Sequence, residues 1–293
     1  MFFVILSAVL FLFPACTESE RMILPVAADY ELEPIVELKH LRVGIATGPY
    51  RDMFIEGIKP SLEKLGYTTV LVSYEDFVSP NFALARNEID LNIFQHYAYL
   101  NTFKFENDLA LSAITEIPTI SMGVFSNRYR SIDNFTRGIT VSIPHDPSNF
   151  ARALMVLEAA GIITLNPFID KTKATLENIA SNPLSIIIVP VESHNLIQSL
   201  NVYDVSVING GVAINGGLHP SQALYNEVLS PNYMIVVALR TEDLDKRFAR
   251  DLIEIIHSPA FRNIIIDPDG RFTDFQKPRS FYDTPFENWR NRF

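Results

Sequence analysis

A histidine lies among aromatic residues at the expected end of a buried strand. Residues 90–103, DLNIFQHYAYLNTF, begin with an apolar strand pattern and continue into Phe94, His96 and Tyr99. Ligands of open α/β sheets bind at the carboxyl ends of the strands, so this segment could present rings and hydrogen-bonding groups to a ligand. The same pattern is also typical of a hydrogen-bonded histidine at a helix start beside core aromatics. The segment alone leaves both interpretations open.

A second candidate site lies at a strand-to-helix junction, residues 142–154, SIPHDPSNFARAL. Asn149 and Arg152 are three residues apart and therefore share one face of the predicted helix. The N-terminus of a helix favours an anion, and an Arg can hold a carboxylate through two parallel hydrogen bonds. We therefore predict a carboxylate site here. The alternative is a solvated surface Arg.

The third candidate is Asn209 in the segment VINGG, residues 207–211, which follows a predicted buried strand. Its amide could offer both a donor and an acceptor to a ligand. Asn-Gly is also a common turn sequence. Because INGG occurs again at residues 214–217, Asn215 is a second possible position for this role.

Motifs of known enzyme classes are absent from the sequence. It contains no GxSxG, no GxxxxGK[ST], no HExxH and no Cys/His spacing typical of a metal site. DPDG at residues 267–270 resembles the start of a calcium loop, but Pro278 stands where the twelfth-position Glu is needed. We therefore interpret the protein as a binder, with no catalytic residue, no cofactor and no metal.

Segments with strand and helix patterns alternate along the chain, which predicts an α/β fold with largely parallel strands. Strands are expected at 41–46, 68–74, 138–143, 185–191, 203–209 and 233–240, and helices at 51–65, from Ser79, at 146–161 and at 241–257. Ser79 is expected to be the N-cap of its helix, with Pro80 in the first turn. We divide the chain into one lobe of residues 40–126 and 229–293 and a second lobe of residues 127–228. A hinge would join the lobes, with a ligand cleft between them.

The N-terminus has the pattern of an export signal. Residues 1–15 are apolar, too short for a spanning helix of ~20 residues, and are followed by Cys16, the only cysteine of the chain. We predict a signal peptide over 1–15, lipid attachment at Cys16 and a tether over 16–39. A signal peptide with an incidental buried Cys is the alternative. The formal charge of -10 argues against a nucleic-acid partner.

Taken together and in this order, the three candidate segments resemble the methionine-binding lipoproteins of the NlpA type, which feed bacterial methionine ABC importers. The resemblance runs from about residue 41 to about residue 261, and VSIPHDPSNFARAL, VINGGVAINGGLHP and SPNYMIVVALR each match a family block. It implies a type II periplasmic-binding-protein fold in which a free amino acid is held between two α/β lobes.

The resemblance also implies a role for each candidate residue. Phe94, His96 and Tyr99 match the pocket segment F-Q-H-x-x-Y, and Phe77 occupies an aromatic position that the family often fills with Tyr. Asn149 and Arg152 match the N-x-x-R that holds the α-carboxylate of the ligand. Asn209 matches the Asn of VIN, and the downstream GLHP fits the family only in this register, which disfavours Asn215.

The implied function is that of a lipid-anchored extracytoplasmic binding protein, acylated (palmitate) at Cys16, on the bacterial cell membrane and facing the periplasm or exterior. It would capture methionine or a similar apolar amino acid and deliver it to ABC permease subunits in the membrane. Two alternatives stay open. One is an enzyme on the same fold, with His96 or His145 as the base, and the other is a surface lipoprotein that has lost transport.

Overall fold

The computed structural model describes residues 39–46 and 48–282 of the chain. The predicted signal peptide, the lipidated Cys16 and all but the last residue of the predicted tether lie outside the described residues. Within the described part, no helix is long and apolar enough to cross a membrane.

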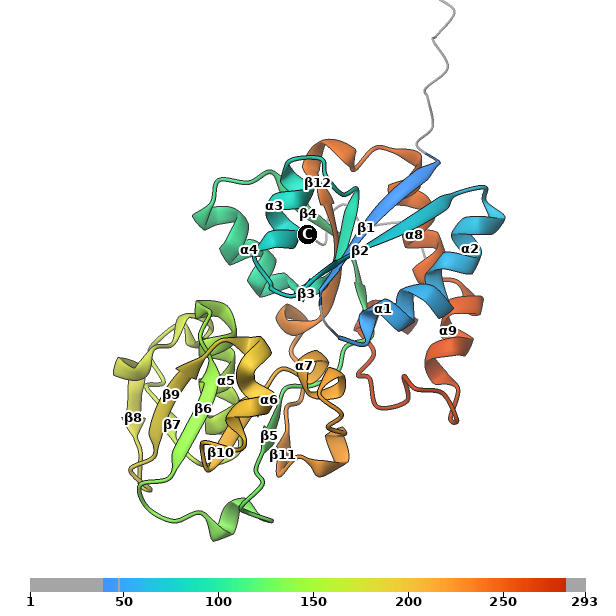
Figure 1. The fold of residues 1–293 in the computed structure, drawn as a ribbon. Helices are drawn as coiled ribbons and strands as arrows, with labels where there is room; N and C mark the ends of the chain where they lie inside the picture. The colour runs from blue at the N-terminus through green and yellow to red at the C-terminus, as the bar shows by residue number, and fades with distance from the viewer. Residues whose placement is uncertain (1–38, 47, 283–293) are drawn as a thin grey trace, which may run out of the picture. The chain divides into compact units, whose positions relative to one another are not determined.

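The first sheet has the strand order β2-β1-β3-β12-β4 (Figure 1). Its strands are β1 (His40–Ala46), β2 (Thr68–Tyr74), β3 (Leu91–His96), β4 (Leu111–Ile117) and β12 (Ile235–Arg240). β1 is parallel to both β2 and β3, whereas β12 lies antiparallel between β3 and β4. The late strand predicted over 233–240 is thus an interior strand of the first sheet, between β3 and β4.

Helices cover both faces of this sheet, which explains the near-continuous apolar sequence of β12. Val237 and Leu239 of β12 pack into one core cluster with Phe54 and Phe248. Val236 and Ala238, which point to the opposite face of the sheet, pack into a second cluster. The helices are α1 (Tyr50–Met53), α2 (Lys59–Lys64), α3 (Ser79–Ala85), α4 (Tyr97–Glu106), α8 (Arg247–Ile256) and α9 (Pro259–Ile266).

Two of these helices differ in detail from the sequence prediction. The helix predicted over 51–65 is α1 and α2 joined by a π-helical turn over Phe54–Ile58. Ser79, predicted as an N-cap, is instead the first residue of α3. The reason is that the Asp76 carboxylate accepts hydrogen bonds from the backbone N–H groups of Val78 and Ser79.

The second sheet has the order β11-β5-β10-β6-β9. Its strands are β5 (Gly123–Phe125), β6 (Thr140–Pro144), β9 (Ile187–Val191), β10 (Val205–Ile208) and β11 (Tyr225–Asn226). β6 is parallel to β9 and β10, and β5 is antiparallel to β10 and β11. The helices α5 (Pro147–Ala159), α6 (Leu196–Ser199) and α7 (Gly210–Asn215) accompany this sheet, with a separate small sheet of β7 (Thr164–Leu165) and β8 (Ile179–Ser181).

The chain passes between the two sheets twice. The first crossover is residues 118–122, between β4 and β5, and the second is residues 227–234, between β11 and β12. Because β5 pairs with β10 and β11, we propose that the lobe boundary lies before residue 123, whereas the sequence analysis places it after residue 126. We propose to treat each sheet with its helices as a lobe, because Leu154 and Leu157 of α5 belong to a core of their own with Val141 and Val207.

Candidate ligand-binding site

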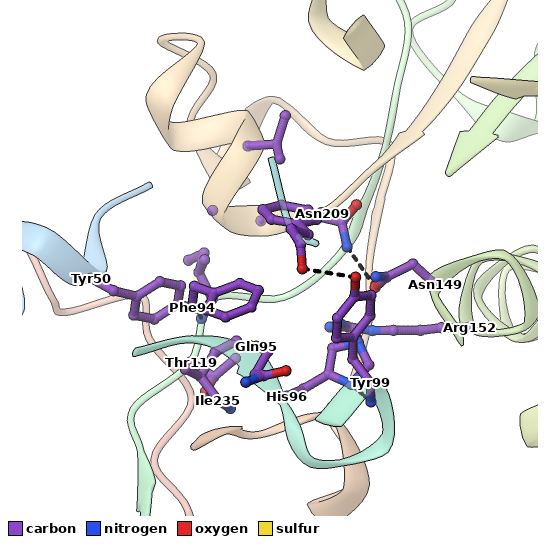
Figure 2. A pocket seen from close by; sticks show the side chains of 15 residues that line it. Tyr50, Phe94, Gln95, His96, Tyr99, Thr119, Asn149, Arg152, Asn209 and Ile235 are labelled. Atoms are coloured by element: carbon purple, nitrogen blue, oxygen red, sulfur yellow. Dashed lines mark hydrogen bonds between the residues drawn. The ribbon is translucent and has the colours of Figure 1, made fainter. Parts of the chain in front are cut away.

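A single pocket collects all seven residues that the sequence predicts for ligand binding (Figure 2). It encloses about 480 Å³ that protein atoms do not fill, a volume that includes space open to solvent. The lining residues are Tyr50, Phe77, Phe94, Gln95, His96, Tyr99, Thr119, Ile120, Asn149, Arg152, Asn209, Gly210, Gly211, Val212 and Ile235. They come from both lobes and from the first crossover.

His96 ends β3 and caps the N-terminus of α4. Its Nδ1 accepts a hydrogen bond from the Tyr99 N–H at 3.1 Å, so the ring proton is on Nε2, which donates to Asn149 Oδ1 at 3.0 Å. Burial and the nearby positive charge of Arg152 lower the pKa of His96 to about 3. The imidazole is therefore neutral, and both of its nitrogens are engaged within the protein. His96 is therefore a hydrogen-bonded cap of α4 that also lines the pocket.

Asn149 lies at the centre of the polar end of the pocket. Its Oδ1 accepts from His96 and also from Asn209 Nδ2 at 2.7 Å, while its Nδ2 donates to the carboxylate of Asp146 at 3.1 Å. Asp146 is the N-cap of α5, and burial raises its pKa. The amide of Asn149 is thus used by protein partners, one of which is Asn209.

Asn209 is left with an unused acceptor. It ends the strand-to-helix turn before α7, and its Oδ1 is buried without a hydrogen-bond partner in the described part of the chain. A buried acceptor that stays unpaired costs about 1–3 kcal/mol, so a ligand that donates a hydrogen bond to this atom would remove that cost. Asn215, the alternative from the repeated INGG, ends α7 and does not line the pocket.

Arg152 is 3% exposed and is held by a carboxylate of the protein itself. Its Nε donates to Glu227 Oε1 at 3.0 Å, its Nη2 donates to Glu227 Oε2 at 2.6 Å, and the guanidinium lies 4.8 Å from the centre of the Tyr233 ring. The bidentate edge that we expected to face a ligand is therefore taken by Glu227. Among the described residues no hydrogen bond to Nη1 is present, so the end of the guanidinium remains for another acceptor.

Glu227 was missed by the sequence interpretation. It lies on the second crossover, 9% exposed, and 75 positions from Arg152. The available signal was indirect, because a buried Arg needs a countercharge and few acidic residues lie in otherwise apolar segments. Tyr50 was also missed, since it reads as part of a turn; it is buried, and its hydroxyl accepts from the Ile120 N–H at 3.4 Å.

An aromatic wall, defined as Phe77, Phe94 and Tyr99, also lines the pocket, and its Tyr99 adjoins the polar end through His96. The rings of Phe77 and Phe94 stack with centroids 5.9 Å apart, and Phe94 meets Tyr99 edge-on at 6.3 Å. The Tyr99 hydroxyl donates to the backbone oxygen of Phe77 at 2.9 Å, and burial raises its pKa. Phe77 also packs against the second-lobe cluster that contains Leu196 and Val212, so this wall of first-lobe residues contacts the second lobe as well.

Gly210 allows the backbone of α7 to approach the first crossover closely. A Cβ at this position would lie 2.2 Å from the backbone oxygen of Ser121, which no side chain tolerates. The glycine of the VINGG segment is therefore required by packing beside the pocket. His145, the other histidine considered as a base, is exposed and lies 3.5 Å from Glu192, outside the pocket lining.

Comparison with known proteins assigns this arrangement to a family. The family model described as NlpA lipoprotein matches residues 41–274. The chain belongs to the NlpA lipoprotein family. It is 28% identical over 222 residues to the D-methionine-binding lipoprotein MetQ of Escherichia coli K12, which covers 75% of this chain and 82% of that protein.

Solved structures of similar proteins agree with this NlpA-family fold. An ABC transporter periplasmic substrate-binding protein from Coxiella burnetii has a TM-score of 0.72 and 33% identity, covering 78% of this chain and 96% of that chain. A nutrient binding protein from Burkholderia cenocepacia, bound to methionine, has a TM-score of 0.73 and 29% identity, covering 77% and 95%. The predicted family and the α/β fold class of a periplasmic binding protein are confirmed, and the family is one of binding proteins rather than enzymes.

Proposed function

We propose that this protein captures a free amino acid, methionine or one of similar size and polarity, and delivers it to the permease of an ABC importer. The names of the similar proteins support the proposal, since they include methionine-binding lipoproteins and a structure with methionine bound. The pocket supports it independently, through the chemistry of its polar end and of its aromatic wall.

One observation carries the proposal: a buried acceptor and a cationic donor, both with unused capacity, line the same pocket. Asn209 Oδ1 has no partner in the described chain, and the end of the Arg152 guanidinium is not occupied by Glu227. An α-amino acid offers an ammonium for the first and a carboxylate for the second, both bonded to its α-carbon. Charge-assisted hydrogen bonds of both kinds are the strong ones.

The aromatic wall then favours an apolar side chain. Apart from Arg152, the residues that line the pocket in the described chain carry no charged side chain. A ligand side chain such as Lys or Glu would lose its hydration without a partner, which is costly. A thioether gains ~0.3–1.5 kcal/mol against ring edges, so methionine suits the space beside Phe77, Phe94 and Tyr99.

Unfolding the purified protein and identifying the released small molecule by mass spectrometry tests the proposal. The refolded, ligand-free protein is then titrated calorimetrically with each amino acid in both enantiomers. We expect methionine or a close apolar relative to be released and to bind most tightly. Release of a charged amino acid, tightest binding of glutamate, lysine or arginine, or no binding of any amino acid would contradict the proposal.

We also propose that the protein is anchored by acyl chains on Cys16 and faces the periplasm or the exterior. Membership of a lipoprotein family supports an anchor. Closure of the two lobes around the ligand would then present a composite surface to the permease. The wild-type protein expressed in a bacterial host should partition into detergent, whereas Cys16→Ala should stay in the aqueous phase; equal partitioning would contradict the anchor.

A further inference from the structure

A third segment, residues 267–277, is hydrogen-bonded to both crossovers. After α9, residues 267–277 bury Phe272 and Phe275 in the core of the first lobe, and this anchors the segment beside both crossovers. Phe275 also contacts the pocket residue Tyr50 edge-on, with ring centroids 6.1 Å apart. The next residue is Gln276, which lies just beyond the residues matched by the family model.

Gln276 is bonded to both crossovers at once. Its backbone N–H donates to Thr119 O at 2.8 Å and its backbone oxygen accepts from Thr119 N at 2.9 Å. Its side-chain Nε2 donates to Ser121 Oγ and, at 2.8 Å, to Glu227 O, while its Oε1 accepts from Leu229 N at 3.0 Å. One amide therefore links residues 118–122 to residues 227–234. A side chain with a single polar atom could not make this set of contacts.

The contact with Glu227 leads directly to the pocket. The Glu227 N–H donates to Met122 O at 2.9 Å, and the Glu227 carboxylate accepts from Met122 N at 3.1 Å and from the Nε and Nη2 of Arg152. The backbone of Glu227 is thus fixed on one side by the first crossover and on the other by Gln276. Since the carboxylate sets the plane of the guanidinium, a shift of this backbone would turn the end of Arg152 that faces the pocket.

We propose that Gln276 is a positioning residue for ligand binding. It holds the two crossovers in register, keeps Glu227 in place and so presents the guanidinium of Arg152 in the orientation that a ligand carboxylate requires. Sites held in their bound geometry bind more tightly, because less ordering remains to be done when the ligand arrives. The part of the inference that concerns the ligand rests on the function proposed above.

The test compares two variants of the same C-terminal segment. Gln276→Ala removes the side-chain amide and leaves the backbone pairing with Thr119. Ser280→Ala is the matched control, because Ser280 Oγ contacts the Glu116 carboxylate on β4 at 3.2 Å and no crossover. We expect methionine to bind Gln276→Ala roughly tenfold more weakly, equivalent to ~1.4 kcal/mol, and Ser280→Ala like the wild type.

A readout without ligand separates this inference from the proposed function. In the unliganded protein, the ¹⁵N–¹H resonance of Arg152 Nε is identified by its loss in Arg152→Lys. The chemical shifts of this resonance should change in Gln276→Ala and stay the same in Ser280→Ala. If wild type binds no amino acid, the proposed function fails, and the resonance still decides whether Gln276 positions Arg152.

Two outcomes would overturn the inference. An Arg152 resonance that is unchanged in Gln276→Ala removes the positioning role, and unchanged methionine affinity in a folded Gln276→Ala removes its importance for binding. A double variant sharpens the result: with Glu227→Gln already present, Gln276→Ala should add little further loss, because the two residues act in series. Should Gln276→Ala not fold, Gln276→Glu keeps the acceptor for Leu229 and loses the two donated bonds, so it takes its place.

Discussion

The polar end of the pocket and its aromatic wall are stabilised by different interactions. At the polar end, Asn149 and Arg152 are fixed by directional hydrogen bonds to His96, Asp146 and Glu227. At the aromatic wall, ring packing dominates. Hydrogen-bond networks in a low-dielectric site fix one geometry, whereas ring packing tolerates several. We infer that the polar end decides whether an amino acid binds, and that the wall decides which amino acid binds.

The largest expected effect comes from removing Arg152. Arg152→Ala should weaken methionine binding by ~2–5 kcal/mol, because one partner of a buried charged contact is lost. It should also destabilise the protein, since Glu227 would be left buried and unpaired. The double variant Arg152→Met with Glu227→Gln separates the two effects: denaturant unfolding should show recovered stability, while calorimetry should still show no tight binding. Wild-type affinity in the double variant would mean that Arg152 does not hold the ligand.

Asn209→Ala should have the next largest effect. A hydrogen bond to a charged group contributes ~1.5–3 kcal/mol, so loss of the Oδ1 acceptor should weaken methionine binding at least about tenfold. Asn215→Ala is the matched control, because it changes the same residue of the second INGG and lies off the pocket. Calorimetry that finds equal losses for the two variants would remove Asn209 from the site.

Acid should destabilise the protein through His96. Its pKa is about 3 in the folded protein against 6.5 for the ordinary group, so the unfolded chain binds more protons between these values. The free energy of unfolding should therefore fall as the pH drops below about 6.5, by up to ~1.4 kcal/mol per pH unit from this residue. Denaturant unfolding at about pH 7 and about pH 5 measures the loss, which His96→Gln should reduce and His40→Gln, at an exposed position, should not. An equal loss in wild type and His96→Gln would show that the imidazole is not the group responsible.

The smallest expected effect is at the aromatic wall. Phe77→Leu removes a stacked ring, a contribution of ~0.5–1.5 kcal/mol, so methionine should bind about two- to tenfold more weakly. The order of affinity among methionine, leucine and norleucine should change at the same time. Phe105→Leu, at a position 88% exposed, is the control and should leave both affinity and order unchanged. An equal loss of affinity for all amino acids in Phe77→Leu would contradict the proposed difference between the polar end and the aromatic wall.

Local sequence was sufficient to predict the parts of the site that lie where a strand leads into a helix. His96 ends β3, Asn209 directly follows β10 and Asn149 lies in the first turn of α5, so their placement depends on a few neighbouring residues. Gly161, just after α5, has a φ of +75°, as its type suggests. The alternation of strand and helix patterns likewise predicted the α/β fold. Periodicity and turn residues are short-range signals, and these features are short-range structures.

The partners of those residues could not be predicted in the same way. Glu227 meets Arg152, and Gln276 meets Thr119 and Ser121, because the chain returns to the first lobe after completing the second. Such contacts depend on how the two crossovers lie beside each other, which no local pattern encodes. The boundary at β5 differed for the same reason, since the pairing of three residues with β10 and β11 is a tertiary choice.

The antiparallel strand β12 also sets an order of folding. β3 and β4 flank β12 and are synthesised long before it, so until residues 235–240 are available their facing edges have no partner. The second lobe has no such gap, because all of its strands lie within residues 123–226. Since contacts between distant parts of a chain form late, we expect the second lobe to fold first. The first lobe would stay incomplete until β12 is available. Unpaired edges attract other chains, so the interval before β12 arrives is when a newly made molecule is most exposed to aggregation.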